Sequence, residues 1–263
     1  MQAIGQAAKQ AQNQSKQQER QNTAPPTAQL QNSSGSASNK PQCPDCGGAK
    51  FYRYDVPINH PMFGKAFPCP SCNADAVMIR SGLNEMERKV KMQDVITEGR
   101  PGTAKMVRTA TEWIANGCKG FLTIHGGVGN GKSTVLKAIV NDCVERGMDV
   151  RYVTMTDVMA YAREAFSSDM KGDSDLGRIK QLANTQVLVI DEMDKARLSE
   201  YAREVQTHLF DARYRNAHAL GTVVTWNGGF DEIDLPWVLS RLSQYPVVEN
   251  NDKDMRPLLG GKE

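Results

Sequence analysis

The sequence predicts an α/β protein whose main domain is a three-layer αβα arrangement around a central parallel β-sheet. Segments typical of strands alternate with segments typical of helices from residue 121 onward, which favours parallel strands joined by helices. One predicted strand, residues 187–190, is a run of four apolar side chains, as expected for a strand covered on both faces. Two C-x-x-C pairs upstream predict an additional small unit.

Length and charge set the limits of this interpretation. The chain has 263 residues, enough for one such domain, a small module and a tail. Lys and Arg number 32 against 30 Asp and Glu, so the overall charge makes no general prediction of nucleic-acid binding. We find no apolar run of about 18 residues and no apolar segment near residue 1. We therefore expect a cytoplasmic protein without membrane contact.

The predicted tail covers residues 1–42. Gln, Asn, Ser, Ala and Thr dominate this segment, and it has almost no large apolar side chains. Such a composition buries too little apolar surface to offset the entropy of folding. We expect this segment to be disordered.

Residues 43–76 are predicted to form a zinc ribbon. Two C-x-x-C pairs are separated by 22 residues and provide four thiolates, Cys43, Cys46, Cys69 and Cys72. Four protein ligands around Zn²⁺ leave no position for a reacting water, so the site would be structural. Two alternatives stay open: a site of three cysteines with His60, which lies between the pairs, and disulfides.

Residues 77–120 are predicted to form a helical lead-in. From about residue 75 to 116, apolar side chains recur among charged ones, and Pro101-Gly102 is expected to break the helix before a further helical stretch from Met106 to Ala115. The main domain would then occupy residues 121–263.

A phosphate-binding loop follows the first predicted strand of this domain, residues 121–125. The pattern G-x-x-x-x-G-K-[ST] is matched by Gly126, Gly127, Val128, Gly129, Asn130, Gly131, Lys132 and Ser133, with Thr134 next. Glycines allow backbone N–H groups to turn toward a polyphosphate, Lys132 can reach the outer phosphates, and the Ser133 hydroxyl can ligate Mg²⁺. The sequence therefore predicts a site for ATP and Mg²⁺.

The remaining core elements alternate in the same way. We predict helices over residues 133–146, 156–166 and 199–216, the last with Ser199 as its N-cap, and strands over residues 150–154, 187–190, 222–226 and 245–249. Cys143 falls on the apolar face of the first helix and is predicted to be a core residue. Cys118 has no assigned role.

Polar residues at two strand ends are candidates for the chemistry. Asp191 and Glu192 follow the apolar strand, where Asp191 could hold Mg²⁺ and Glu192 could orient or deprotonate the attacking water. Asn227 ends the next strand and could sense the terminal phosphate. A solvated loop end and a turn-forming Asn before Gly228 are the alternatives.

With Gly-x-x-Gly-x-Gly-Lys-Ser, Val-Leu-Val-Ile-Asp-Glu, an Asn-tipped strand and Ser-Arg-Leu in this order, the chain resembles AAA+ ATPases from about Ser81 to Arg256. Within them it is similar to DnaC-like replicative helicase loaders and IstB-like transposition proteins. The resemblance implies that Arg241 is an arginine finger reaching the neighbouring protomer's ATP and that Arg256 is a second sensor. Seven residues follow Arg256, so a helical lid is expected to be truncated or absent.

The resemblance also implies partners. A zinc module ahead of an ATPase is similar to bacterial and phage loaders that grip a hexameric replicative helicase, whereas IstB-like proteins generally lack such a module. The stretch from Met155 to Leu182 lies where such proteins meet single-stranded DNA, with Tyr161, Arg163, Phe166 and Lys171 as candidate contacts and core packing as the alternative for the aromatic pair.

We expect an oligomeric ATP-dependent helicase loader acting on single-stranded DNA. Two alternatives remain: a transposition helper ATPase that acts on duplex DNA, and a switch that binds ATP without hydrolysing it.

Overall fold

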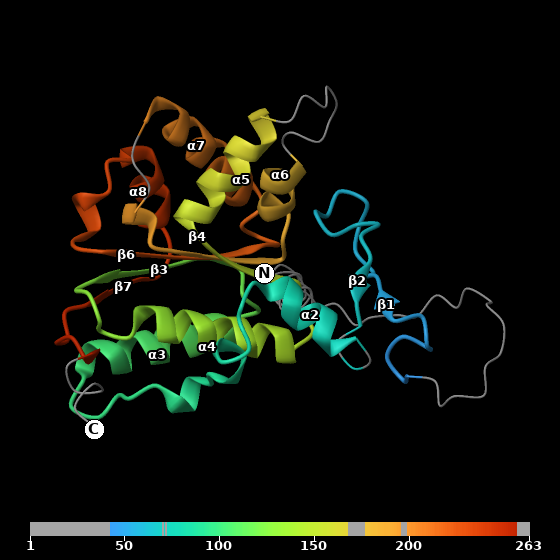
Figure 1. The fold of residues 1–263 in the computed structure, drawn as a ribbon, viewed down its shortest axis with the longest axis horizontal. Coiled ribbons are helices and arrows are strands. Elements are labelled where there is room, and N and C mark those ends of the chain that lie inside the picture. The colour runs from blue at the N-terminus through green and yellow to red at the C-terminus, as the bar shows by residue number, and fades with distance from the viewer. Residues whose placement is uncertain (1–42, 70, 72, 168–176, 196–198, 257–263) are drawn as a thin grey trace, which may run out of the picture.

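The main domain contains a five-stranded parallel sheet with the strand order β4-β5-β6-β3-β7 (Figure 1). A computed structural model describes residues 43–69, 71, 73–167, 177–195 and 199–256. The strands are β3 (Gly120–Gly126), β4 (Val150–Thr154), β5 (Val187–Asp191), β6 (Gly221–Asn227) and β7 (Val247–Asn250). Each neighbouring pair in this order is parallel, which confirms the predicted sheet.

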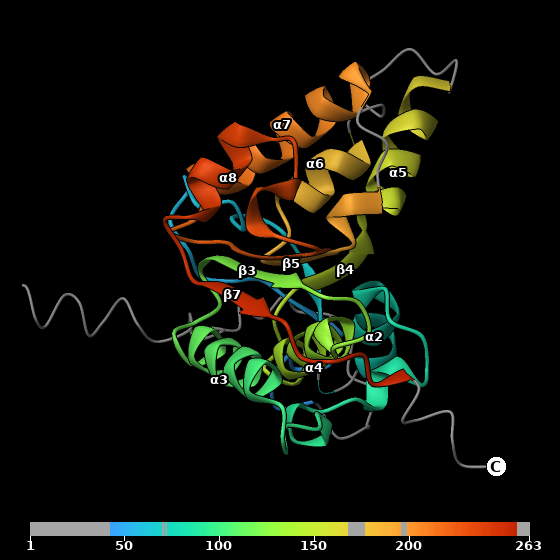
Figure 2. The ribbon, with the colours of Figure 1, turned by 90° about the vertical axis from the view of Figure 1, so that its left-hand side faces the viewer.

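Helices cover both faces of the sheet, so the domain has three layers (Figures 1 and 2). One face carries α5 (Met155–Ser167), α6 (Gly177–Ala183), α7 (Glu200–Arg215) and α8 (Pro236–Leu242). The other carries α2 (Ala74–Ser81), α3 (Pro101–Ala115) and α4 (Lys132–Glu145). The predicted three-layer αβα arrangement is confirmed.

The pleat of β5 explains why its sequence is apolar at every position. Leu188 and Ile190 pack into the core under α5, α6, α7 and α8, whereas Val187 and Val189 pack into the core on the other face. All five residues of this strand are buried. The second core also contains Cys118 and Cys143, whose sulfur atoms lie 3.7 Å apart, so Cys143 is a core residue as predicted and Cys118 is its neighbour.

Most element boundaries match the sequence predictions within one or two residues. The Ser199 hydroxyl accepts a hydrogen bond from the N–H of Ala202 at 3.1 Å, which confirms it as the N-cap of α7. Two helices, α6 and α8, were not predicted; each has only seven residues, too few to establish a helical period.

The prediction for residues 75–116 is wrong in part. Between α2 and α3 the described chain contains two 3₁₀ turns, η1 (Glu87–Lys89) and η2 (Met92–Asp94), in place of a continuous helix. Pro101 occupies the first turn of α3 and starts this helix rather than breaking it. A proline fits there because the first N–H groups of a helix have no partner within the helix.

A short antiparallel hairpin, β1 (Phe51–Tyr52) and β2 (Phe67–Pro68), packs against the amino edge of the sheet, where the parallel strands begin. The Tyr54 hydroxyl lies 3.0 Å from the carbonyl oxygen of Gly147, before β4, and 2.9 Å from Oε1 of Gln186, before β5. Met62 and Phe67 form a small apolar cluster with Leu220 of the main domain. The hairpin therefore contacts the edge opposite the phosphate loop.

The remaining short elements are η3 (Met193–Lys195) after β5 and η4 (Phe230–Glu232) after β6. Among the described residues, every helix is too short or too polar to cross a lipid bilayer.

Candidate nucleotide site

The phosphate loop connects β3 to α4 at the carboxyl edge of the sheet. Gly131 is the N-cap of α4 in the left-handed conformation, with φ of 95°, so the loop turns directly into the helix at Lys132. A cavity of about 340 Å³ opens at this point. The predicted site residues that line it are Val128, Gly129, Asn130, Gly131, Lys132, Ser133, Thr134, Asp191, Glu192, Asn227 and Arg256. The structure thus brings the phosphate loop and the acidic pair to one cavity.

Two loop glycines are required by close contact with the end of β7 and with the residues that follow it. A Cβ atom on Gly126 would lie 2.1 Å from the carbonyl oxygen of Asn250, and one on Gly129 would lie 1.7 Å from Oδ1 of Asp254. Both glycines have φ values in the left-handed region. The N–H of Gly127 donates to the same Asn250 oxygen at 3.1 Å. The end of β7 and the residues after it therefore pack directly against the phosphate loop.

Lys132 lies at the base of the cavity and is 7% exposed. Among the described residues, its ammonium donates to the carbonyl oxygens of Gly126 and Gly127 and to the Oδ1 atoms of Asn130 and Asn227, at 3.1 Å for Asn227. All four acceptors are neutral. Burial lowers the pKa of Lys132, and the carboxylates of Asp191 and Asp194 oppose this shift.

Asp191 is buried at the end of β5, with an exposed fraction of 4%. Its Oδ2 accepts a hydrogen bond from the Tyr152 hydroxyl at 2.7 Å, and its Oδ1 accepts from the Thr225 hydroxyl and from the N–H of Glu192. Burial, followed by the adjacent Asp191 charge, raises the pKa of Tyr152, so the phenol keeps its proton. Asp191 thus accepts three hydrogen bonds and lines the cavity.

Glu192 and Asn227 lie on the same cavity. Glu192 has φ of 54°, an uncommon conformation for a residue other than glycine, and its side chain is exposed. The Asn227 Nδ2 group donates to Oδ2 of Asp194 at 3.1 Å while its Oδ1 accepts from Lys132. Asn227 therefore connects the phosphate loop with η3.

The two predicted arginines lie in different surroundings. Arg256 lines the cavity, and the preceding residue, Met255, donates its N–H to the carbonyl oxygen of Gly129 at 3.0 Å. Arg241 is absent from the described lining of the cavity; on α8 it forms an ion pair with Asp211, and its guanidinium lies 5.1 Å from the ring centres of Tyr214 and Trp237. Within one chain, Arg241 does not meet the nucleotide site.

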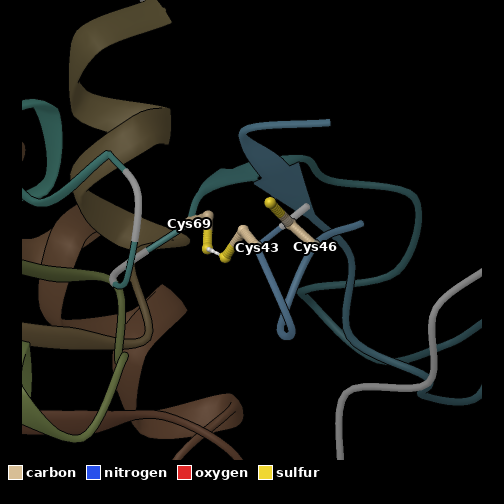
Figure 3. A group of neighbouring side chains, drawn as sticks. All are labelled: Cys43, Cys46 and Cys69. Carbon is tan, nitrogen blue, oxygen red and sulfur yellow. Dashed lines mark hydrogen bonds between the residues drawn. The ribbon is translucent and has the colours of Figure 1, made fainter. Parts of the chain in front are cut away.

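Three of the four predicted zinc ligands form a cluster (Figure 3). The sulfur atoms of Cys43, Cys46 and Cys69 all lie within 4.8 Å of one another, and this group can hold a metal ion. Cys72 lies outside the described residues. The sulfur atoms of Cys43 and Cys69 are 3.8 Å apart, well beyond the roughly 2.05 Å of a disulfide.

His60 is not part of this cluster. Its Nδ1 atom accepts a hydrogen bond from the N–H of Met62 at 3.1 Å. The alternative site of three cysteines and His60 is therefore not what the described residues form.

The candidate DNA contacts are only partly described. Tyr161 on α5 is half-buried and packs against the core, and Arg163 is exposed. The Phe166 side chain and Lys171 lie outside what the structure describes.

Sequence reasoning missed several residues at the site. Tyr152, Asp194, Lys195, Thr225 and Met255 contact the predicted residues or line the cavity. Asp194 and Lys195 lie two and three residues after Glu192 and could have been found by their position. Tyr152 and Thr225 lie on neighbouring strands, and only the pairing of the sheet brings them to Asp191.

Comparisons with known proteins identify the family and the fold of the chain. The match to the replicative helicase loader DnaC of Escherichia coli K12 is 25% identical over 150 residues, which is 56% of this chain and 60% of the loader's length. A crystal structure of the DnaC helicase loader covers 64% of this chain and 100% of its own, with a TM-score of 0.51 and 18% identity. The replication initiator DnaA bound to AMPPCP and single-stranded DNA covers 65% of this chain and 51% of its own, with a TM-score of 0.55 and 18% identity.

The structural comparisons agree with the observed fold. The two solved structures share the three-layer fold with this chain. A family model described as IstB-like ATP binding protein matches residues 93–237, more than half of the chain. The chain therefore belongs to the family of IstB-like ATP-binding proteins and has a DnaC-like AAA+ fold.

Proposed function

We propose that this protein is an ATP-dependent loader that places a hexameric replicative helicase on single-stranded DNA in the cytoplasm of a bacterial or phage-infected cell. The observation that carries the proposal is that the phosphate loop and the acidic pair line the same cavity, in a chain of an ATP-binding family. The match to a replicative helicase loader of Escherichia coli supports the loader role. Because that match spans 60% of the relative, the partner itself must be tested.

The residues at the cavity fit a nucleoside triphosphate. Lys132 is a buried cation, and within the described chain all of its hydrogen-bond acceptors are neutral. A phosphate group would provide a negatively charged acceptor for it. The glycines leave the loop backbone free of side chains at positions where a Cβ would clash. The loop N–H groups and the start of α4 would bind the phosphates.

The acidic pair has two proposed roles. Asp191 and the Ser133 hydroxyl would hold Mg²⁺, which when bound neutralises negative charge on the phosphates. Glu192 would take the proton of the attacking water, and Asn227 would orient that water or the terminal phosphate. The uncommon backbone conformation of Glu192 is of the kind found at functional sites.

Arg241 is proposed to act on the ATP of a neighbouring subunit. It forms an ion pair with Asp211 on α7 and is not part of the described lining of its own cavity, which suits a role in trans and requires an oligomer. Arg241→Ala should lower ATP turnover, and mixing it with Lys132→Ala protein should restore part of the activity. No recovery in mixtures would contradict the role in trans.

The cysteine cluster is proposed to hold Zn²⁺ with Cys72 as the fourth ligand. Cys46 and Cys69 are buried and Cys43 is half-buried, and the N–H of Gly47 donates to the carbonyl oxygen of Cys43 at 2.8 Å, which forms a tight turn around the first pair. Thiolates clustered in this way suit tetrahedral zinc. The module formed by residues 1 to about 75 would grip the helicase.

The decisive experiment is a loading assay. The protein, a candidate replicative helicase and ATP are incubated with circular single-stranded DNA or with duplex DNA of the same length, and helicase retained on DNA is measured after gel filtration. We expect ATP-dependent retention on the single strand. The same fold occurs in a DnaA bound to single-stranded DNA, which makes a single strand the first nucleic acid to test.

The match to IstB-like ATP-binding proteins leaves one alternative proposal, a transposition helper that assembles on duplex DNA. Preference for duplex over single-stranded DNA, together with no capture of the helicase, would support that function in place of the loader. A Glu192→Gln variant that loads helicase as well as the parent would instead indicate a switch that needs only ATP binding.

A further inference from the structure

We infer that Tyr152 is a positioning residue that, together with Thr225, fixes the Asp191 carboxylate for the metal ion. This inference rests on the proposed function, because it assigns Asp191 to the magnesium shell. Neither residue belongs to the phosphate loop or to the acidic pair.

The hydrogen bonds on Asp191 use both carboxylate oxygens. Oδ2 accepts from the Tyr152 hydroxyl at 2.7 Å, and Oδ1 accepts from the Thr225 hydroxyl and, at 2.9 Å, from the N–H of Glu192. An ionised carboxylate accepts about four hydrogen bonds. The three donors therefore hold the plane of the group and leave room for one further ligand.

These donors come from both strands that flank β5. In the pairing with β4, Asp191 lies opposite Thr154, and Tyr152 is two residues earlier on the same face of that strand. On the other side, Ile190 pairs with Val224, so Thr225 lies beside Asp191. Rotation of the carboxylate would break a bond to at least one neighbouring strand.

Tyr152 is packed against α2 and the core. Gly82, the C-cap of α2, lies so close to β4 that a Cβ atom on it would be 2.5 Å from the Tyr152 carbonyl oxygen. Tyr152 also packs against the core beneath α2 and α4, and the described lining of the cavity does not include it. It therefore acts through Asp191 and would not touch the nucleotide.

Substituting Tyr152 with Phe isolates this contact because only the hydroxyl is removed. Binding of a fluorescent ADP analogue to the full chain is measured first in EDTA and then during a titration with Mg²⁺. Loss of a hydrogen bond that supports a metal ligand typically weakens metal binding by about 10-fold or more. We expect the Mg²⁺ midpoint of Tyr152→Phe to rise about 10-fold, with metal-free nucleotide affinity unchanged.

Tyr54→Phe is the matched control, since it removes a hydroxyl that is hydrogen-bonded at the opposite edge of the sheet. It should leave both measurements at the parent's values. Thr225→Val removes the donor on the other carboxylate oxygen and should raise the Mg²⁺ midpoint as Tyr152→Phe does. If Tyr152→Phe cannot be purified folded, Thr225→Val decides the inference by the same criteria.

Two results would overturn the inference alone. In the first, the parent shows a clear Mg²⁺ midpoint and the midpoint of Tyr152→Phe equals that of Tyr54→Phe. In the second, Tyr152→Phe loses nucleotide affinity in EDTA to the same extent as in Mg²⁺. If the parent itself bound nucleotide with no response to Mg²⁺, the proposed site would fail and the inference with it.

Discussion

The two edges of the parallel sheet are built in different ways. At the carboxyl edge, the end of β3 continues into the phosphate loop, and the ends of β5 and β6 carry Asp191 and Asn227, so each residue is placed by a strand that is itself buried. At the amino edge, a hairpin with two residues in each strand contacts the sheet through the Tyr54 hydroxyl and through an apolar cluster of Met62, Phe67 and Leu220, of which Leu220 belongs to the main domain.

This difference indicates which region depends on the other. The pocket is part of the main core, whereas the hairpin has an apolar cluster too small to fold without support from metal or from the main domain. We therefore expect changes at the pocket to alter nucleotide chemistry with little effect on the hairpin. Changes at the hairpin should alter its docking and partner capture with little effect on the pocket.

The largest expected effect is at Glu192. Glu192→Gln keeps the size of the side chain and removes the proposed proton acceptor, so we expect ATP turnover to fall about 1000-fold while ATP binding is retained. Steady-state hydrolysis and binding of a fluorescent ATP analogue measure the two separately.

The matched control for this variant is Glu145→Gln, at the end of α4, where Glu145 forms an exposed ion pair with Lys91. It should hydrolyse ATP like the parent. If both variants retain turnover, Glu192 is not the catalytic acid–base residue.

The next effect is at Lys132. Lys132→Ala should weaken ATP binding about 100-fold, since truncating a buried charged partner costs about 3 kcal/mol. Lys65→Ala is the control at the other edge, because the Lys65 ammonium donates to the carbonyl oxygen of Asn184 at 3.2 Å. Calorimetric titration should separate the two variants. Equal losses of affinity would show that the edges are not independent.

Most of the pocket residues could be predicted from the sequence because they fall in short contiguous motifs. The phosphate loop and the acidic pair are short motifs directly after apolar strands, and strand ends of a parallel sheet meet at one edge. Ser199, as the cap of α7, was found for the same reason: its role depends on local chemistry.

What the sequence could not predict depends on pairing between distant segments. Tyr152 and Thr225 reach Asp191 only through the strand order, and Arg241 meets Asp211 only when α8 packs on α7. The error around Pro101 has another cause. Proline is compatible both with the end of one helix and with the first turn of the next, and local pattern does not separate them.

A smaller effect on the pocket is expected from loss of the cysteine cluster. Cys43→Ser should reduce bound zinc and lower helicase capture about 10-fold. The zinc ion would lose one of its ligands, and the hairpin would then lose the metal that organises it. Basal ATP turnover should stay within about two-fold of the parent if the comparison of the two edges is correct.

Zinc content, pull-down of the helicase and steady-state hydrolysis test this prediction together. Ser71→Ala is a control in the same module, since Ser71 is exposed and bonds only to Asp45 in the described chain. Loss of turnover in Cys43→Ser without change in Ser71→Ala would mean that the pocket depends on the metal module.

The smallest expected effect is at Tyr54. Tyr54→Phe removes contacts with the Gly147 carbonyl and the Gln186 side chain, and we expect it to weaken docking of residues 43–69 by about 1 kcal/mol. Hydrogen exchange of the hairpin amides should become faster, whereas Tyr214→Phe, which removes a hydroxyl contact with Gln244 on the surface, should leave exchange unchanged.

The same variant gives the most sensitive test of independence, because Gly147 lies three residues before β4 and Gln186 directly precedes β5, and these strands carry Tyr152 and Asp191. We expect Tyr54→Phe to change hairpin exchange and to leave the Mg²⁺ midpoint of nucleotide binding at the parent's value. A shift in that midpoint would mean that docking of the hairpin moves these strands. A change in exchange alone would mean that the sheet is rigid enough to separate its two edges, and that a partner bound at the hairpin must reach the nucleotide by another route.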